Sequence, residues 1–183
     1  GQFPDTKWKI NNLGKGWVLG ETLITGIGQG YTQTTPIQLC LMTAQIANGG
    51  YKIKPRILTD DNQLTSEKVK MAMQTGELNN SDTPLFNNQK NIKIIQEAMF
   101  SSTNELRGTS YNSRIDDPKY QFAGKTGTAQ VKKITKLQRE LDLETYQIPY
   151  EERDHAWFVA FGPYENPRYA MCVFVEHGGS GSS

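Results

Sequence analysis

The stretch Phe122-Ala123-Gly124-Lys125-Thr126-Gly127-Thr128-Ala129-Gln130-Val131 decides the fold. We predict that residues 120–131 form a β-strand that carries the most distinctive group of polar residues in the chain. Lys125 is flanked by threonines, so one cation and two hydroxyl donors occur together, which suits the binding of a carboxylate. Gly127 has no side chain, so a second backbone can approach the strand closely or add to it as a further strand.

This group of residues suits acyl transfer from a peptide that ends in a free carboxylate. Such a reaction needs a partner for the carboxylate, a donor to the oxyanion and a nucleophile. Lys125 and the hydroxyls of Thr126 and Thr128 can supply the first. The backbone N–H of Thr128 can be one of two oxyanion donors, an effect of about 3–4 kcal/mol in a dry site. Because side chains alternate along a strand, Lys125 and Thr126 lie on opposite faces unless the site wraps around the strand edge.

Two apolar runs after this strand predict a hairpin. Residues 156–161 and 169–175 are continuously apolar, which is typical of central strands covered on both faces. Residues 162–167 contain glycine and two prolines and predict the turn of an antiparallel pair. Residues 132–154, which are rich in charge, form an excursion with one short helix around Ile134, Leu137 and Leu141. The fold class is therefore α+β, with an antiparallel sheet flanked by helices.

A helix is predicted from Thr35 to Asn48. Thr35 and Gln38 have the spacing of a capping box, Pro36 suits the first turn, and Gly49 ends the helix. Its residues are apolar nearly all round, which predicts a buried helix.

A second, amphipathic helix is predicted at about 89–106. Asn87 or Asn88 caps its start and Gly108 ends it. One face carries Ile92, Ile95, Met99 and Leu106.

The remaining segments are predicted with less regular structure. Residues 1–34 are rich in turn formers, with Trp8 and Trp17 as anchors, and the glycines of 26–30 let two backbones pack closely. They do not form a nucleotide loop, because Tyr31 stands where a third glycine is needed. Residues 51–58 and 68–74 alternate in polarity and can pair as strands.

Composition indicates one soluble globular domain. The 183 residues are 36% hydrophobic and 21% charged, with a net charge of +1. The basic cluster Lys132, Lys133 and Lys136 is followed closely by acidic residues, so we expect no nucleic-acid partner. No run approaches the ~20 apolar residues of a membrane span. The first residue is Gly1 and the last six are glycine and serine, which favours an excised piece with no anchor of its own.

Cysteine and histidine spacing predicts neither a metal site nor a cofactor. Cys40 and Cys172 are far apart in apolar runs and are expected to be buried free thiols, although spacing alone leaves a disulfide open. With His155 and His177 they form no C-x2-C or H-x3-H pattern.

The chain offers no nucleophile that we can identify. Lys-Thr-Gly occurs with Ser-x-x-Lys and Ser-Asp-Asn in penicillin-binding proteins and class A β-lactamases. In Thr65-Ser66-Glu67-Lys68 the serine is one residue too close to the lysine. Ser102-Thr103-Asn104 matches Ser-x-Asn, but it lies in the last turns of the predicted helix, and we interpret it as a coincidence.

Further segments, in order, extend the resemblance over essentially the whole chain. The sequence resembles the C-terminal half of a class B penicillin-binding protein transpeptidase domain, and the elongation-type members more than the septal ones. The segments are Trp8-Lys9, Gly26-Ile27-Gly28-Gln29-Gly30-Tyr31, Thr35-Pro36-Ile37-Gln38-Leu39, Ala47-Asn48-Gly49-Gly50, Gly124-Lys125-Thr126-Gly127-Thr128-Ala129-Gln130 and Phe161-Gly162-Pro163-Tyr164.

The resemblance implies a D,D-transpeptidase that cross-links peptidoglycan stem peptides ending in D-Ala-D-Ala and is acylated by β-lactams. It implies a five-stranded antiparallel sheet with helices on both faces. Lys125 would neighbour the serines of the other two motifs, Thr126 and Thr128 would hold the carboxylate, and the Thr128 amide would complete the oxyanion hole.

The resemblance also defines what lies outside residues 1–183. The nucleophile helix and the Ser-x-Asn loop would precede Gly1 and a last helix would follow Ser183, so we expect the chain alone to be inactive. The parent protein would work on the periplasmic side of the bacterial inner membrane, with a membrane glycosyltransferase of the elongation machinery as its partner. Two alternatives are a non-catalytic module that binds peptide carboxylates or β-lactams, and a serine β-lactamase, for which we identify no deacylating carboxylate.

Overall fold

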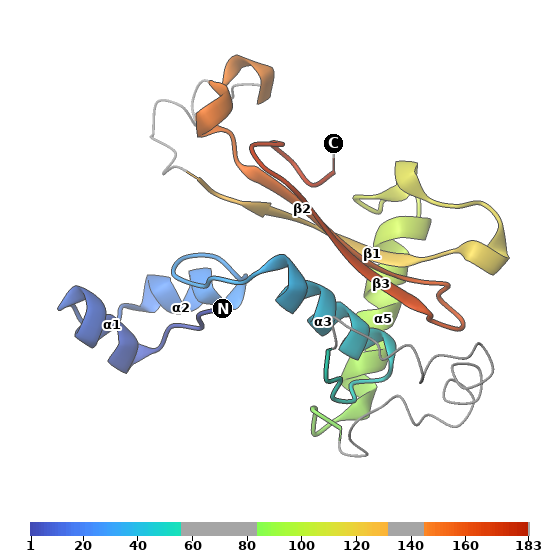
Figure 1. Ribbon diagram of the computed structural model, residues 1–183, viewed down its shortest axis with the longest axis horizontal. Helices are drawn as coiled ribbons and strands as arrows, with labels where there is room; N and C mark the ends of the chain where they lie inside the picture. Colours follow the sequence, from blue (N-terminus) through green and yellow to red (C-terminus); the bar gives the residue numbers. More distant parts are fainter. Residues whose placement is uncertain (56–83, 132–144, 183) are drawn as a thin grey trace, which may run out of the picture. The chain divides into compact units, whose positions relative to one another are not determined.

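The computed structural model describes residues 1–55, 84–131 and 145–182. They divide into two compact units. One contains Gly1–Leu39, Thr126–Phe158 and Cys172–Ser183, and the other contains Cys40–Lys125 and Val159–Met171. The helices and strands, labelled in Figure 1, are α1 (Thr6–Leu13), α2 (Leu19–Gly26), α3 (Pro36–Ala47), α5 (Gln89–Asn104), β1 (Ala123–Ala129), β2 (His155–Gly162) and β3 (Tyr169–Val175).

The three strands form one antiparallel sheet in the order β1-β2-β3. The predicted α+β class and the hairpin are therefore confirmed, and β1, which carries the lysine and threonines, is an edge strand of the described sheet. The turn between β2 and β3 begins with a cis Gly162-Pro163 peptide, and the Arg168 N–H donates to Gly162 O at 2.9 Å.

The predicted caps of α3 are present. The Gln38 N–H donates to Thr35 Oγ1 at 3.4 Å, and the Thr35 N–H donates to Gln38 Oε1 at 3.0 Å, which together make the capping box. Gly49 follows the helix with φ of 89°, in the left-handed region that ends helices.

Helix α5 agrees with the predicted amphipathic helix to within two residues. Asn88 caps its start by accepting a hydrogen bond from the Lys90 N–H at 3.0 Å. Of the predicted apolar face, Ile92 and Met99 are buried, whereas Ile95 is 38% exposed. Leu106 is 80% exposed, and its predicted place on the apolar face is wrong because the helix already ends at Asn104.

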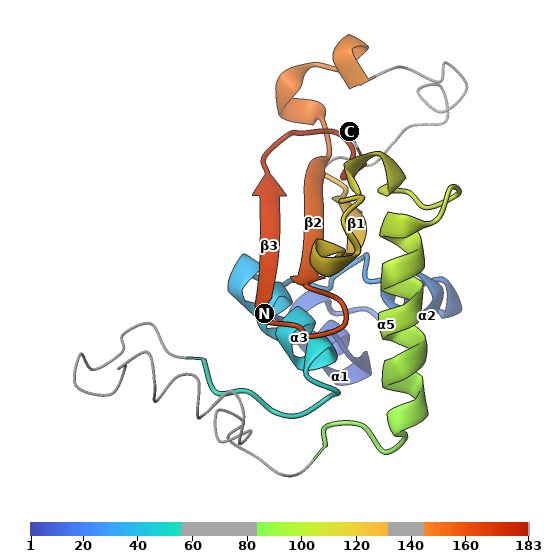
Figure 2. The same cartoon turned by 90° about the vertical axis from the view of Figure 1, so that its right-hand side faces the viewer.

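The core of the second unit joins α3 and α5 to the sheet. Ile46, Met99, Ala123 and Phe161 form its buried cluster. Figure 2 shows α5 alongside the sheet, and Met99 brings that helix against the beginning of β1 and the end of β2.

Two predictions for the N-terminal region need correction. Residues 6–13 and 19–26 are helices, not turns. Asp5 caps α1 by accepting from the Trp8 N–H at 2.7 Å, and Gly14 ends it with φ of 64°. The glycines of 26–30 do not serve close packing: Gly28 and Gly30 both have φ of 76°, so their role is conformational.

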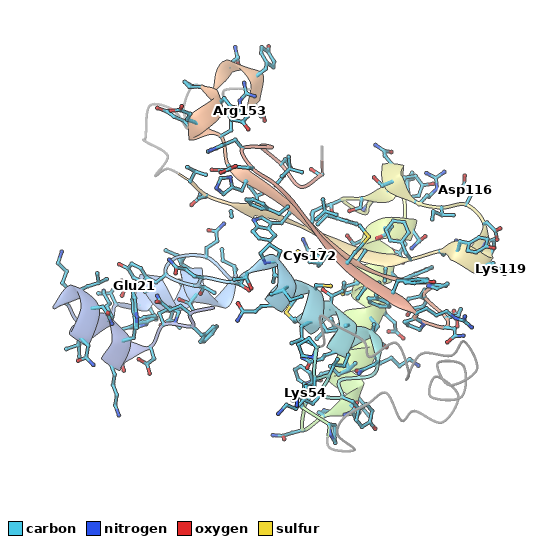
Figure 3. The ribbon with its side chains drawn as sticks, viewed as in Figure 1. Glu21, Lys54, Asp116, Lys119, Arg153 and Cys172 are labelled. Carbon is cyan, nitrogen blue, oxygen red and sulfur yellow. The ribbon has the colours of Figure 1, made fainter. Side chains whose placement is uncertain are left out.

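Burial was overestimated for α3, β3 and the thiols. On α3, Ile37 is 64% exposed and Met42 is 43% exposed, whereas the buried side chains are Thr43 and Ile46. On β3, Tyr169 is 78% exposed. Cys40 and Cys172 are free, as predicted, but half-buried (Cys172 is labelled in Figure 3). An apolar run in the sequence predicts burial, but it does not show whether the residues that bury it belong to the described part of the chain.

Other predictions lie partly or wholly outside the described residues. These are the strand 68–74, the short helix around Ile134–Leu141, and the Ser66–Lys68 spacing. Of the strand predicted at 51–58, the described part shows one bridge, between Tyr51 and Pro84. None of the helices in the described ranges has the length and apolar character needed to cross a bilayer.

Candidate active site strand

Strand β1 passes from the core to the surface within a few residues. Ala123 is fully buried and Gly124 is buried, whereas the side chains of Lys125 and Thr128 are exposed. Thr126, between them, is half-buried. The strand is therefore fixed by packing at its first residues and presents its polar residues beyond the packed part.

Side-chain hydrogen bonds hold both ends of β1. Just before the strand, Asn104 Nδ2 donates to Phe122 O at 2.9 Å and to Phe100 O at 3.0 Å, which ties the end of α5 to the strand's first residues. Just beyond it, the Val131 N–H donates to Asp154 Oδ1 at 3.2 Å. The polar stretch thus lies between two fixed points.

Gly127 is not required by its protein neighbours. Its φ is outside the left-handed region, and a Cβ built on it would meet Trp157 Cβ at 3.4 Å, an ordinary van der Waals distance. Neither the backbone conformation nor crowding among the described residues requires a glycine at this position. This is consistent with the prediction that Gly127 leaves room for the backbone of a ligand.

The four predicted site residues are therefore consecutive on an edge strand, at the point where it leaves the core. The side chains of Lys125 and Thr128 are exposed. The roles assigned to Lys125, Thr126, Gly127 and Thr128 stay predictions.

The residues of the Ser-x-Asn match at 102–104 make structural contacts at the end of α5. Thr103 is fully buried and its hydroxyl donates to Met99 O at 3.3 Å, while Asn104 makes the two bonds to Phe100 and Phe122 described above. Ser102 Oγ lies 3.2 Å from Thr109 Oγ1. These contacts support the interpretation of the match as a coincidence.

The sequence contains a second Ser-x-Asn match that our prediction missed. It is Ser110-Tyr111-Asn112, at a short 3-10 helix (Tyr111–Ser113). The Ser110 N–H donates to Ser102 O at 3.0 Å, which folds this turn back onto the end of α5, and the Ser110 side chain is buried. A buried serine in a turn of this kind gives no sign of a catalytic role.

The two histidines tie the start of β2 to the residues after β3. The His177 N–H donates to His155 Nδ1 at 3.0 Å, and His177 Nδ1 lies 2.9 Å from Arg153 O. His177 has φ of 53°, and its ring packs 5.0 Å from that of Tyr150. Among the residues that the structure describes, no group of three or more potential metal ligands occurs.

Comparison with known proteins now gives the class. The family described as penicillin binding protein transpeptidase domain matches residues 2–183, and the chain belongs to that family. The match includes the Lys-Thr-Gly-Thr strand and the glycine-rich residues at the end of the chain.

The similar proteins and solved structures include ones named MrdA and PBP2. The peptidoglycan D,D-transpeptidase MrdA of Acinetobacter baumannii is 35% identical over 185 residues, which is 100% of this chain and 25% of that protein. A crystal structure of Pseudomonas aeruginosa PBP2 in complex with WCK 5153 is 35% identical, with a TM-score of 0.72, over 100% of this chain and 35% of the other. The complex between PBP2 and MreC from Helicobacter pylori is 32% identical, with a TM-score of 0.70, over 98% and 28%.

A peptidoglycan synthase complex that coordinates polymerization and crosslinking is also similar. The identity is 27% and the TM-score 0.64, over 100% of this chain and 26% of that one. The chain spans about a quarter of the length of the curated relatives it matches. It is thus part of a transpeptidase domain, as the resemblance predicted.

Proposed function

We propose that the protein containing this chain is a peptidoglycan D,D-transpeptidase of the elongation type, which cross-links stem peptides ending in D-Ala-D-Ala and is acylated by β-lactams. The observation that carries the proposal is the Lys125–Thr128 stretch of an edge strand, with the Lys125 and Thr128 side chains exposed, in a chain whose family is a penicillin-binding transpeptidase domain. Relatives named as D,D-transpeptidases at 31–35% identity support the same activity.

The proposed roles follow from the chemistry of the exposed strand. The Lys125 ammonium would lie beside the nucleophile. The hydroxyls of Thr126 and Thr128 would bind the carboxylate of the donor peptide or of a β-lactam. The Thr128 N–H would donate to the oxyanion. Because β1 is an edge strand of the described sheet, an extended substrate backbone could add beside it, with Gly127 leaving room for it.

The serine nucleophile would come from a Ser-x-x-Lys helix outside this chain. Serine and lysine three residues apart on a helix share a face, so the lysine amine can reach the serine hydroxyl. In this chain no serine is followed by a lysine at that spacing. The chain alone is therefore expected to be inert toward penicillin.

Location and partners belong to the same proposal. A protein that cross-links stem peptides would work on the periplasmic side of the bacterial inner membrane, next to a membrane glycosyltransferase that supplies glycan strands. Similarity to PBP2 in complex with MreC and to a peptidoglycan synthase complex supports assembly with the elongation machinery.

The test uses two proteins, this chain alone and the full-length parent protein that contains it. We expect a fluorescent penicillin to label the full-length protein covalently and to leave the chain alone unlabelled. A stem-peptide substrate should then lose its terminal D-alanine and form cross-linked product. A folded full-length protein that takes no label would refute the proposal.

The same assays separate the alternatives. Labelling without release of D-alanine would indicate a binding module, and rapid hydrolysis of the penicillin with recovery of free enzyme would indicate a β-lactamase. Covalent labelling of the chain by itself would contradict its expected inertness.

A further inference from the structure

Beyond the end of β3 the chain turns back across the sheet as a glycine-rich segment, residues 178–182, which we call the glycine segment (Figure 2). Its first glycine has no space for a side chain. A Cβ on Gly178 would lie 2.9 Å from Val175 Cγ1 and 3.0 Å from Ala156 Cβ. These neighbours are side chains of β2 and β3, and no atom of β1 is among the three nearest to that Cβ.

The second glycine is held in place from both sides. Gly179 has φ of 82°, and its N–H donates to Asp154 O at 2.8 Å. A Cβ on it would lie 2.5 Å from Thr145 Cγ2. The glycine segment is therefore tied at Gly179 to Asp154, the residue just before β2.

The third glycine lies directly on the backbone of the candidate site. A Cβ on Gly181 would lie 2.5 Å from Gly127 O and 3.0 Å from Gly127 N, and closer still to Trp157 O. All three atoms are main-chain atoms, which cannot turn aside as a flexible side chain would. Gly181 has no left-handed φ, so the contact with β1 and β2 is what excludes a side chain there.

The contact matters because of what shares a peptide plane with Gly127 O. The peptide bond is planar, so Gly127 O and the N–H of Thr128 belong to one rigid unit. A shift or tilt of Gly127 O therefore re-aims the Thr128 N–H. Gly127 N belongs to the preceding unit, which carries the carbonyl of Thr126.

We propose that Gly181 is a positioning residue for the reaction: by lying flat against Gly127, it fixes the orientation of the Thr128 amide. This inference rests on the proposed function, in which that amide donates to the oxyanion. Because an oxyanion donor acts on the transition state and not on the bound ground state, a badly aimed amide slows acylation without weakening the initial complex.

The experiment compares Gly181→Ala with Gly178→Ala in the full-length protein. Both variants add one methyl group to the glycine segment, but only the first presses on β1. Stopped-flow acylation by a fluorescent penicillin gives the acylation rate constant and the dissociation constant of the prior non-covalent complex. Thermal unfolding gives the stability of each variant.

We expect Gly181→Ala to lower the acylation rate constant roughly 10- to 100-fold, part of the 10²–10³-fold effect of removing an oxyanion donor. The dissociation constant should change less than threefold. Gly178→Ala, at a comparable loss of thermal stability, should keep its acylation rate within threefold of the wild type.

Two results would overturn the inference: an unchanged acylation rate in Gly181→Ala, or an equal fall in both variants. A wild-type protein that is not acylated at all would instead refute the proposed function. If Gly181→Ala does not accumulate in folded form, Ser180→Gly provides the test.

Ser180→Gly frees the glycine segment without adding an atom, because it removes the bonds of Ser180 Oγ to Ser182 Oγ at 2.8 Å and to the Ser182 N–H at 3.3 Å. A several-fold fall in acylation rate at unchanged thermal stability would support the positioning role. An unchanged rate in this variant would overturn it.

Discussion

The core around Phe161 and the pair of N-terminal helices are held together by different means. In the core, Phe161 and Met99 are at least nine-tenths buried and pack against other apolar side chains. Between α1 and α2 the buried side chain is Lys9, whose ammonium donates to Gly16 O and to Glu21 Oε2, both at 2.6 Å. Helix α2 has no buried residue of its own.

The difference shows that the two regions are stabilised by interactions that respond to different changes. Burial of apolar surface is insensitive to pH and falls sharply when a side chain is cut back. A tie made by one ammonium and one carboxylate depends on the charge of both groups. The core should therefore respond to truncation, and the helix pair to protonation.

The largest expected effect comes from cutting into the core. In the protein containing this chain, Phe161→Ala should lower the free energy of unfolding by about 3–5 kcal/mol, because it removes a ring that is 2% exposed and leaves a cavity. Denaturant unfolding measures this change. Leu106→Ala, at a side chain that is 80% exposed, should cost less than about 0.5 kcal/mol. Equal costs for the two would show that the cluster around Phe161 is not the core.

A smaller and different effect is expected on the exposed stretch of β1. Thr128→Ala should slow acylation by a penicillin about 5- to 150-fold, which corresponds to roughly 1–3 kcal/mol for a hydrogen bond to a charged group. Its stability should stay close to that of the wild type, because the side chain is exposed. Gln130→Ala, two residues further on, is the matched control and should acylate normally. Unchanged kinetics in Thr128→Ala would remove the residue from the carboxylate site.

The smallest expected effect tests the tie between α1 and α2. The hydrogen bond from Lys9, followed by that from the Val18 N–H, lowers the pKa of the Glu21 carboxyl from its ordinary value of 4.5 (Glu21 is labelled in Figure 3). A carboxyl whose pKa is lower in the folded state stabilises the fold above its unfolded pKa, and this contribution is lost as pH falls through the folded pKa.

Thermal unfolding between pH 7 and pH 3 would measure this contribution. The wild type should lose stability below about pH 4.5 more steeply than Glu21→Gln, in which position 21 no longer titrates. Glu97→Gln removes an exposed carboxylate 3.9 Å from Lys93 and should keep the steep wild-type slope. If stability falls equally with pH in the wild type and in Glu21→Gln, the ion pair between Lys9 and Glu21 does not contribute to stability.

The elements that sequence predicted well have local signals at both ends. Helix α3 has the capping box and Gly49, α5 has Asn88 and an apolar face, and the hairpin has two apolar runs around a turn. Helices α1 and α2 were missed although Asp5 and Gly14 mark the first of them. Each is only eight residues long, so periodicity had few positions in which to show.

The candidate site was predictable only as far as its residues are consecutive. The candidate residues Lys125 to Thr128 could be identified directly from the sequence, and the structure places them on an edge strand of the described sheet. The contact of Gly181 with Gly127 could not be predicted, because it joins residues far apart in sequence through main-chain atoms that leave no mark on side-chain patterning. The exposure of α3 and β3 could not be predicted for a related reason. An apolar segment indicates that it is buried in the complete protein, but it does not indicate which part of the protein covers it.

Strand β3 has a practical consequence for anyone producing this chain by itself. It forms the other edge of the described sheet, with Tyr169 78% exposed and Val175 50% exposed. An exposed apolar strand at the edge of a sheet is a template on which a second copy can pair. We therefore expect the isolated chain to precipitate or form mixed aggregates at the concentrations used for crystallisation, and charged substitutions on the outward side of β3 to be the first step toward a soluble sample.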